Sequence, residues 1–231
     1  MKNFVLIGIL FLILSNLFAQ NSRRVIHLSG TISDKYHIKM ILTFNDNEVV
    51  GFYYYEKYKE KILLEGSIKN EIITLHEVFN DEFDCVKQFI GNLSDSNFVG
   101  IWVDQEQHKK LKFNTIIDSI EVITISSQIL EMEGYYKSVF NSENCSDFIE
   151  LKYIIDDIFY FDISTDDQSG CTGQIKGLVQ FSKKRIGKFS TKDCDEILFT
   201  FLNTRLILNE NNCSFHGINC YFEGEYIKKR R

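Results

Sequence analysis

Histidine and glutamate, the residue types that most often move protons in enzymes, are adjacent at only one place in this sequence. His76 is followed directly by Glu77, and the other four histidines are spread along the chain (His27, His37, His108 and His216). Neighbouring side chains on a β-strand point to opposite faces, so His76 and Glu77 cannot act together as a dyad. The sequence also contains no nucleophile-elbow, zinc-protease, phosphate-loop or dinucleotide-binding pattern. We therefore predict that the protein is not an enzyme and that it binds no cofactor.

Acidic residues gather in four short clusters, which a calcium site or a hydrolytic pair of carboxylates would need. The clusters lie at 81–84, 156–157, 166–167 and 193–196. None has the spacing of an EF-hand loop, and all lie where the apolar pattern predicts turns, in which solvated acids are common. We expect solvated turns and no metal site.

The N-terminus has the three parts of a secretory signal peptide. Met1-Lys2-Asn3 is a positive start, residues 4–14 are eleven apolar or glycine residues, and Ala19 is a small residue at the expected cleavage position. The alternative is an uncleaved membrane anchor, although a bilayer span needs roughly 20 apolar residues. We predict that residues 1–19 are cleaved, that the protein is periplasmic or secreted, and that the mature chain has no membrane-spanning segment.

Export gives the six cysteines a structural meaning, because disulfides form in oxidising compartments. Six cysteines allow fifteen pairings. The short spacing between Cys213 and Cys220 favours a bond between them, which would close a small loop. Cys171 and Cys194 each precede a strand-like run and form the second predicted pair.

The two remaining cysteines, Cys85 and Cys145, either bridge the two halves of the chain or stay free. Zinc is the alternative use of these six thiols. A structural zinc site needs close cysteine pairs, and the sequence has no C-x-x-C and only one nearby imidazole, that of His216. We therefore expect disulfides rather than zinc.

Aromatic residues give the clearest signal for binding. Residues 52–55 and Tyr58 place rings on both faces of one predicted strand, so some of these rings must lie outside the core. Exposed tyrosines often anchor binding surfaces. The candidate binding surface consists of Tyr53, Tyr55, Tyr58 and Tyr135. The alternative is that the outer rings pack between two domains or against a loop.

The composition limits the classes of partner. The chain has 231 residues, of which 44% are hydrophobic and 14% aromatic, and its formal net charge is −6. Such a chain is too apolar to be disordered, and it has no basic field to neutralise phosphates, so we predict no nucleic-acid partner. Residues 228–231 form a short basic tail that we expect to be solvated.

Alternation of apolar and polar residues predicts strands through nearly the whole mature chain. Eight short runs rich in β-branched and aromatic residues fall within residues 20–116, and about eight more fall within residues 132–231. The short connections are rich in Asn and Asp, as in antiparallel hairpins. We predict an all-β fold of two tandem antiparallel meanders, each a small barrel or a strongly curled sheet. Residues 117–131 join them as strand, helix or connector.

Glycines, aromatics and cysteines recur in an order that resembles known exported domains. The motifs of the C-terminal half are Cys171-x-Gly173, Leu198-Phe199-x-Phe201 after Cys194, Cys213-x-x-His216-Gly217 and Phe222-x-Gly224-Glu225-Tyr226. They resemble small lipocalin-like β-barrel domains of exported bacterial proteins, some of which stand beside segments similar to lysozyme inhibitors. In the N-terminal half, the motifs Gly51-Phe52-Tyr53-Tyr54-Tyr55, Leu64-x-Gly66 and Gly100-x-Trp102 resemble other exported meander domains. The resemblance implies a protein that binds an envelope component, and it carries over no catalytic residue.

These observations predict an exported, non-enzymatic binding or interaction protein of the cell envelope that acts through the outer surfaces of filled barrels. The first alternative is a carrier whose barrel opens to a small ligand. A second alternative, implied only by the resemblance, is an inhibitor of a cell-wall-degrading enzyme such as lysozyme, and an uncharacterised hydrolase comes last. A cavity of several hundred Å³ would favour the carrier.

Overall fold

A computed structural model describes residues 22–79, 87–139, 147–166, 172–217 and 220–229. Several sequence predictions concern residues outside this part of the chain: the signal peptide (1–19), the acidic cluster at 81–84, and the cysteines Cys85, Cys145 and Cys171.

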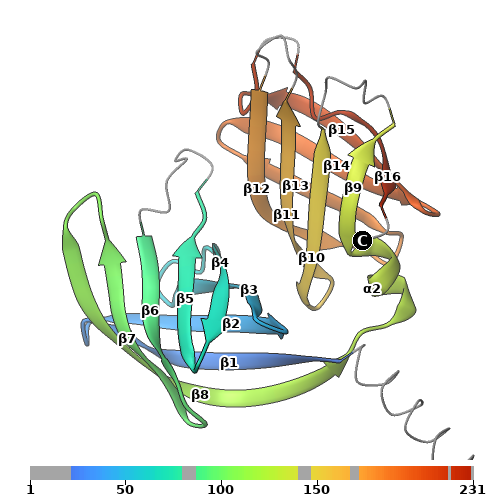
Figure 1. The fold of residues 1–231 in the computed structure, drawn as a ribbon. Coiled ribbons are helices and arrows are strands. Elements are labelled where there is room, and N and C mark those ends of the chain that lie inside the picture. The colour runs from blue at the N-terminus through green and yellow to red at the C-terminus, as the bar shows by residue number, and fades with distance from the viewer. Residues whose placement is uncertain (1–21, 80–86, 140–146, 167–171, 218–219, 230–231) are drawn as a thin grey trace, which may run out of the picture.

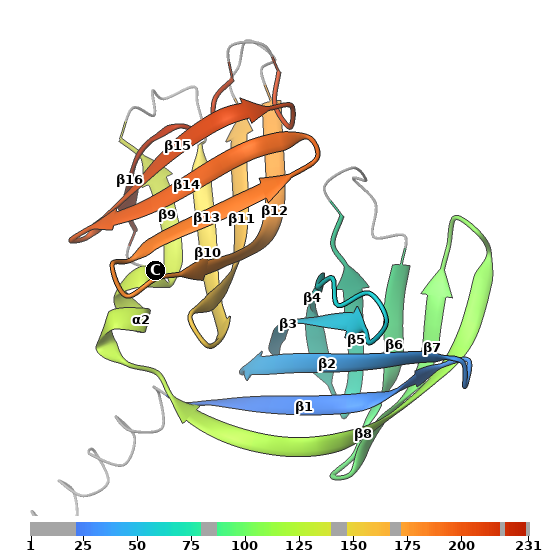
Figure 2. The same cartoon turned by 180° about the vertical axis from the view of Figure 1, so that it is seen from behind.

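The fold is all-β, as the alternation predicts, and consists of two closed eight-stranded barrels (Figure 1 and Figure 2). In the first barrel each strand pairs antiparallel with the next along the chain, and β1 pairs with β8 to close the ring. Its strands are β1 (Ser22–Ile32), β2 (Tyr36–Asn45), β3 (Glu48–Tyr55), β4 (Ile62–Lys69), β5 (Ile72–Glu77), β6 (Lys87–Leu93), β7 (Asn97–Asp104) and β8 (Lys109–Thr124).

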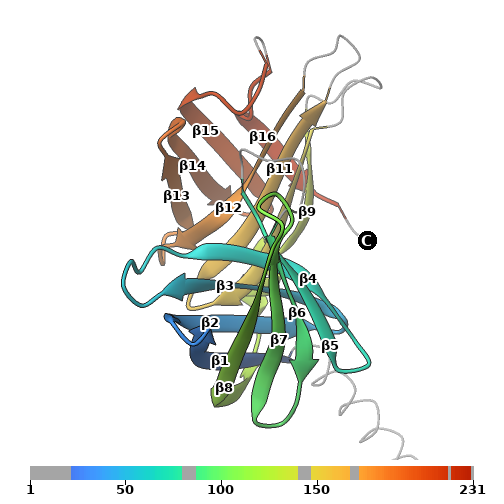
Figure 3. The same cartoon turned by 90° about the vertical axis from the view of Figure 1, so that its left-hand side faces the viewer.

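The second barrel closes where β9 lies between β10 and β16. Its strands are β9 (Gly134–Ser138), β10 (Phe148–Ile155), β11 (Ile158–Asp166), β12 (Thr172–Phe181), β13 (Ile186–Thr191), β14 (Cys194–Leu202), β15 (Arg205–Cys213) and β16 (Gly224–Lys228). Figure 3 shows this barrel as two layers, with β13, β14 and β15 on one side and β9 and β11 on the other.

The seam between β12 and β13 is closed partly by side chains. These strands pair at only two positions, next to their connecting turn. Beyond that pairing the ring of Phe189 packs against Phe161, with centroids 4.8 Å apart. Gly177 makes room for both rings, because a Cβ at this position would come within 2.6 Å of Cε2 of Phe189.

The segment between the predicted domains, residues 117–131, is part strand and part helix. β8 continues to Thr124, which pairs with Ser22, so the first barrel extends past the predicted boundary at residue 116. Ser126 then caps a short helix, α2 (Ser127–Met132), by accepting a hydrogen bond from the N–H of Ile129. Within the described ranges, no helix has both the length and the apolar character needed to cross a membrane.

Both barrels have filled interiors. In the first, a chain of edge-to-face rings runs from Tyr53 through Phe89 and Phe113 to Phe98, with centroid separations of 5.2, 5.2 and 4.7 Å. A comparable group of phenylalanines fills the second barrel. Burial of these rings and of the aliphatic residues around them is the main stabilising contribution in each barrel. Filled interiors leave room for a ligand only near a barrel end or between the barrels.

An apolar cluster joins the two barrels. Its members are Val25, Val50, Phe52 and Leu63 from the first barrel and Ile154, Ile155, Ile158 and Tyr160 from the second. The hydroxyl of Thr43, which is buried, donates a 2.9 Å hydrogen bond to the carbonyl of Ile154. The guanidinium of Arg23 donates two hydrogen bonds of 2.6 Å to the carboxylate of Glu133. The barrels therefore share one interface with an apolar centre and polar links beside it.

Candidate ligand-binding site

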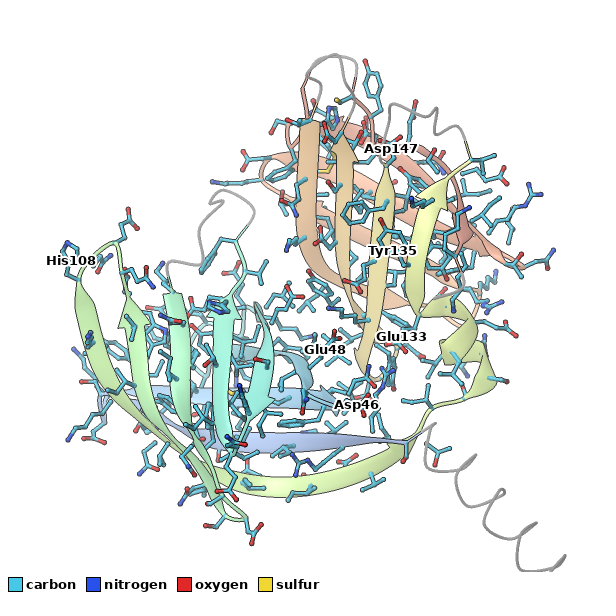
Figure 4. All side chains as sticks on the ribbon, in the orientation of Figure 1. Asp46, Glu48, His108, Glu133, Tyr135 and Asp147 are labelled. Atoms are coloured by element: carbon cyan, nitrogen blue, oxygen red, sulfur yellow. A yellow bond between two sulfur atoms is a disulfide. The ribbon has the colours of Figure 1, made fainter. Side chains whose placement is uncertain are left out.

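A cavity of about 690 Å³ lies at one end of the first barrel. The turns at residues 33–35, 56–58 and 105–108 surround this end. Figure 4 shows His108 at the tip of one of these turns, on the side of the barrel away from the second barrel. The volume lies within the range of small-molecule sites in proteins. We call this space the mouth cavity.

Strand register brings four aromatic side chains to the mouth cavity. They are Tyr36, Tyr55, Tyr58 and Trp102. Tyr55 ends β3 and pairs with Ile38 of β2, two residues from Tyr36, so the two tyrosine rings meet edge to face with centroids 6.3 Å apart. Tyr58 is 68% exposed and Tyr36 41%, whereas Trp102 is only 8% exposed. The cavity therefore has an exposed aromatic rim and a buried indole in its wall.

A buried carboxylate holds Trp102 from inside the barrel. Glu77, the last residue of β5, is 4% exposed, and its Oε1 accepts hydrogen bonds from the Trp102 Nε1 and the Tyr53 hydroxyl, both at 2.6 Å. Burial raises the pKa of Glu77 above its ordinary value of 4.5, although the two hydrogen bonds and the charge of Lys87 favour the ionised form. The orientation of the Trp102 indole at the cavity wall thus depends on Glu77, whose side chain lies inside the barrel.

Glu77 was not among the predicted site residues. It lies on the same side of β5 as Ile73 and Leu75, both of which are fully buried. The alternation along this strand was therefore the signal that the side chain of Glu77 points into the barrel. His76, which points to the other face, takes no part in the cluster, so the prediction that the pair forms no dyad agrees with the structure.

Three lysines also line the mouth cavity: Lys35, Lys57 and Lys109. The Nζ of Lys35 lies 5.2 Å from the ring centroid of Tyr36, and the Nζ of Lys57 lies 5.1 Å from that of Tyr58. Glu56 is the only acidic residue among the described residues that line the cavity, so these residues carry a net charge of +2 with histidine neutral. The lining is thus positive in a chain whose net charge is −6.

The fold divides the predicted tyrosine surface. Tyr55 and Tyr58 line the mouth cavity. Tyr53 is 1% exposed and lies in the core of the first barrel, so its assignment to a binding surface is wrong. Tyr135 lies on β9 of the second barrel, where it stacks on Phe148 with centroids 5.1 Å apart and lines a different cavity.

The two faces of β3 explain this division. Val49, Tyr53 and Tyr55 pack into the core of the first barrel, whereas Phe52 and Tyr54 on the other face pack in the cluster shared with the second barrel. Phe52 is accordingly 2% exposed. The alternative that outer rings pack between two domains is therefore correct for this strand.

A second cavity, of about 930 Å³, lies at the junction of the barrels beside α2. Figure 4 shows Glu48, Glu133 and Tyr135 in this region. The four glutamates that line it all pair with cations: Glu133 with Arg23, Glu48 and Glu150 with Lys152, and Glu131 with Arg185. The described lining also holds Lys228 and Lys229, so its four cations balance its four glutamates, and the junction cavity offers a ligand less unbalanced charge than the mouth cavity does.

The disulfide pairing differs from the prediction. Cys194 is bonded to Cys213, so the predicted pairs Cys213–Cys220 and Cys171–Cys194 are both wrong. The two bonded cysteines lie directly opposite each other in the β14–β15 register, at equal distances from the turn at residues 203–204. Since a hairpin pairs residues that are equidistant from its turn, this symmetry was the signal for the bond.

Cys220 is disulfide-bonded as well. Both of these bonds involve the second barrel, the half in which disulfides were expected.

The histidines and acids form no common site in the described part of the chain. His216 pairs with Glu210 at 3.0 Å, and His27 lies 3.3 Å from Glu121. His37 lines the mouth cavity. No group of three or more His, Cys, Asp or Glu side chains among the described residues is arranged to hold a metal ion.

Comparisons with protein-family models, with curated proteins and with solved structures find no match to this chain.

Proposed function

We propose that this protein is an exported, non-enzymatic binding protein that takes a small amphipathic molecule into the mouth cavity of its first barrel. The observation that carries this proposal is the mouth cavity itself, with about 690 Å³ of space and four aromatic side chains around it. Aromatic walls with a few polar groups are typical of small-molecule sites. The small-ligand carrier, which the sequence alone offers as the first alternative, thereby becomes the leading proposal.

The filled core of the first barrel supports a ligand held at the mouth rather than deep inside. Phe89 and Phe98 are fully buried in the core of the first barrel, so a ligand would rest against Trp102 and the tyrosines that line the cavity. Part of the ligand would then stay in contact with solvent, which suits an amphipathic molecule with a polar end. The disulfides and the absence of a membrane-crossing helix among the described residues are compatible with export.

Trp102 makes the binding proposal testable, because it is the only tryptophan in the chain. We would titrate the protein with phenylnaphthylamine, a neutral apolar dye, and measure energy transfer from the excited indole to the dye. We expect saturable transfer with one dye per protein. The double variant Tyr36→Ala/Tyr58→Ala should bind about tenfold more weakly, since each aromatic contact contributes about 0.5–1.5 kcal/mol.

Tyr221→Ala is the matched control. Tyr221 is also exposed, at 54%, but it belongs to the second barrel. It should leave the dye affinity unchanged. Absence of saturable transfer in the wild type, or equal loss of affinity in the control, would contradict a ligand site at the mouth. Export is tested separately by the mass of the protein from its host, which should match a chain that begins at Gln20.

A further inference from the structure

The three lysines of the mouth cavity are exposed, and they differ from the partly buried lysines at the barrel junction in the way their charge is balanced. Lys35, Lys57 and Lys109 come from three different turns or strand starts and converge on one space. Within the described chain, none of the three has a carboxylate oxygen within 4.0 Å. The Nζ atoms of Lys35 and Lys57 lie instead over the rings of Tyr36 and Tyr58.

Lysines at the junction of the barrels show the opposite arrangement. Lys152 lies within 3.8 Å of three glutamates, and Lys176 lies 3.1 Å from Asp162 and 3.8 Å from Glu65. Carboxylates therefore balance the charge of these two junction lysines. The mouth lysines are exposed, line a cavity and have no such carboxylate partner among the described residues.

Three lysines line this one space, so an anion bound in it would lie near several positive charges. An ammonium group near a low-dielectric aromatic wall also attracts an anion more strongly than one in bulk water does. The walls between the lysines are aromatic, so the same space accepts an apolar body. A ligand with one anionic end and one flat or aliphatic end matches both features.

We infer that the mouth cavity selects amphipathic anions, with the carboxylate, sulfonate or phosphate end at Lys35, Lys57 and Lys109 and the apolar end against Tyr55 and Trp102. This inference rests on the proposed function, since it names the class of molecule that the same cavity takes.

Two dyes of the same skeleton test the inference. Anilinonaphthalene sulfonate carries one sulfonate, and phenylnaphthylamine lacks it. The wild type should bind the sulfonate at least tenfold more tightly than the neutral dye. Since salt screens charges over about 8 Å at physiological strength and about 3 Å at 1 M, high salt should remove most of this preference.

The lysines are tested by the triple variant Lys35→Gln/Lys57→Gln/Lys109→Gln. It should lose at least tenfold in affinity for the sulfonate and less than twofold for the neutral dye. The matched control is Lys137→Gln/Lys183→Gln/Lys184→Gln, which removes the same charge from exposed positions of the second barrel. The control should keep the preference.

The outcomes separate the two proposals. Equal affinity for both dyes in the wild type, with no effect of salt, would overturn the selection of anions and leave the ligand site standing. Failure of both dyes to bind would overturn the ligand site and the selection together. The salt titration uses the wild type alone, so the inference stays falsifiable even if the triple variant does not fold.

Discussion

Removal of the Glu77 carboxylate tests how the wall of the mouth cavity is held in place. In Glu77→Leu the Trp102 Nε1 and the Tyr53 hydroxyl both lose the carboxylate oxygen that accepts their hydrogen bonds. A buried donor without a partner costs about 1–3 kcal/mol. Removal of a buried charge offsets part of this loss. We expect the free energy of unfolding to fall by about 2–4 kcal/mol.

Glu77→Gln is the matched control, because its carbonyl oxygen can accept the same two hydrogen bonds. Near pH 4.5 we expect its stability to lie within about 1 kcal/mol of the wild type. The two proteins should diverge as pH rises. Burial raises the pKa of Glu77, so the folded protein binds this proton more tightly than the unfolded chain does. The stabilisation from Glu77 is therefore complete below its ordinary value of 4.5 and is lost as pH rises through the raised pKa.

Urea unfolding followed by Trp102 emission measures both effects, since the only tryptophan lies in the first barrel. Relative to Glu77→Gln, the wild type should lose up to about 1.4 kcal/mol for each pH unit above 4.5 until the carboxyl is ionised. A Glu77→Leu protein as stable as the wild type would refute the hydrogen-bond argument. Parallel pH profiles for the wild type and Glu77→Gln would refute the raised pKa.

Three further variants test the barrel junction, the packing between β12 and β13, and the disulfide between β14 and β15. Arg23→Ala should lower the free energy of unfolding by about 2–4 kcal/mol, because the Glu133 carboxylate loses its cation at the barrel junction. Urea unfolding measures this change, and no loss would mean that the pair does not stabilise the junction. Gly177→Ala should cost about 1–3 kcal/mol because the new Cβ would meet the ring of Phe189, and an unchanged melting temperature would contradict this packing. Cys194→Ser/Cys213→Ser should destabilise the second barrel by about 3 kcal/mol, which is the chain-entropy value for a loop of this separation. The unfolding midpoint measured by Trp102 emission in the first barrel should not change. Equal loss in both barrels would show that the bond does not act locally.

The fold was predictable because apolar and polar residues alternate along most strands, although β3 and β11 are buried on both faces over part of their length. Short turns rich in Asn and Asp fix the hairpins, so the number of strands and their antiparallel order followed from the pattern. The length of β8 did not follow. Ile116, Ile120 and Val122 are exposed apolar residues on a strand that continues past the predicted boundary, and only pairing with β1 shows why the strand extends there.

The candidate site was predictable in part. Tyr55 and Tyr58 were selected because aromatics crowd one strand, and both line the mouth cavity. The sequence did not indicate which face of that strand meets the second barrel, so Tyr53 was placed outside when it lies inside. The convergence of Lys35 and Lys109 could not be predicted, because it depends on barrel closure, which brings turns separated along the chain to one end.

A crystal structure of the protein soaked with anilinonaphthalene sulfonate tests the central claim most directly. The account predicts one dye molecule in the mouth cavity, with its rings against Trp102 and its sulfonate within hydrogen-bonding or ion-pairing distance of at least one of Lys35, Lys57 and Lys109. Dye bound only in the junction cavity beside α2, or an empty mouth cavity at saturating dye, would contradict it.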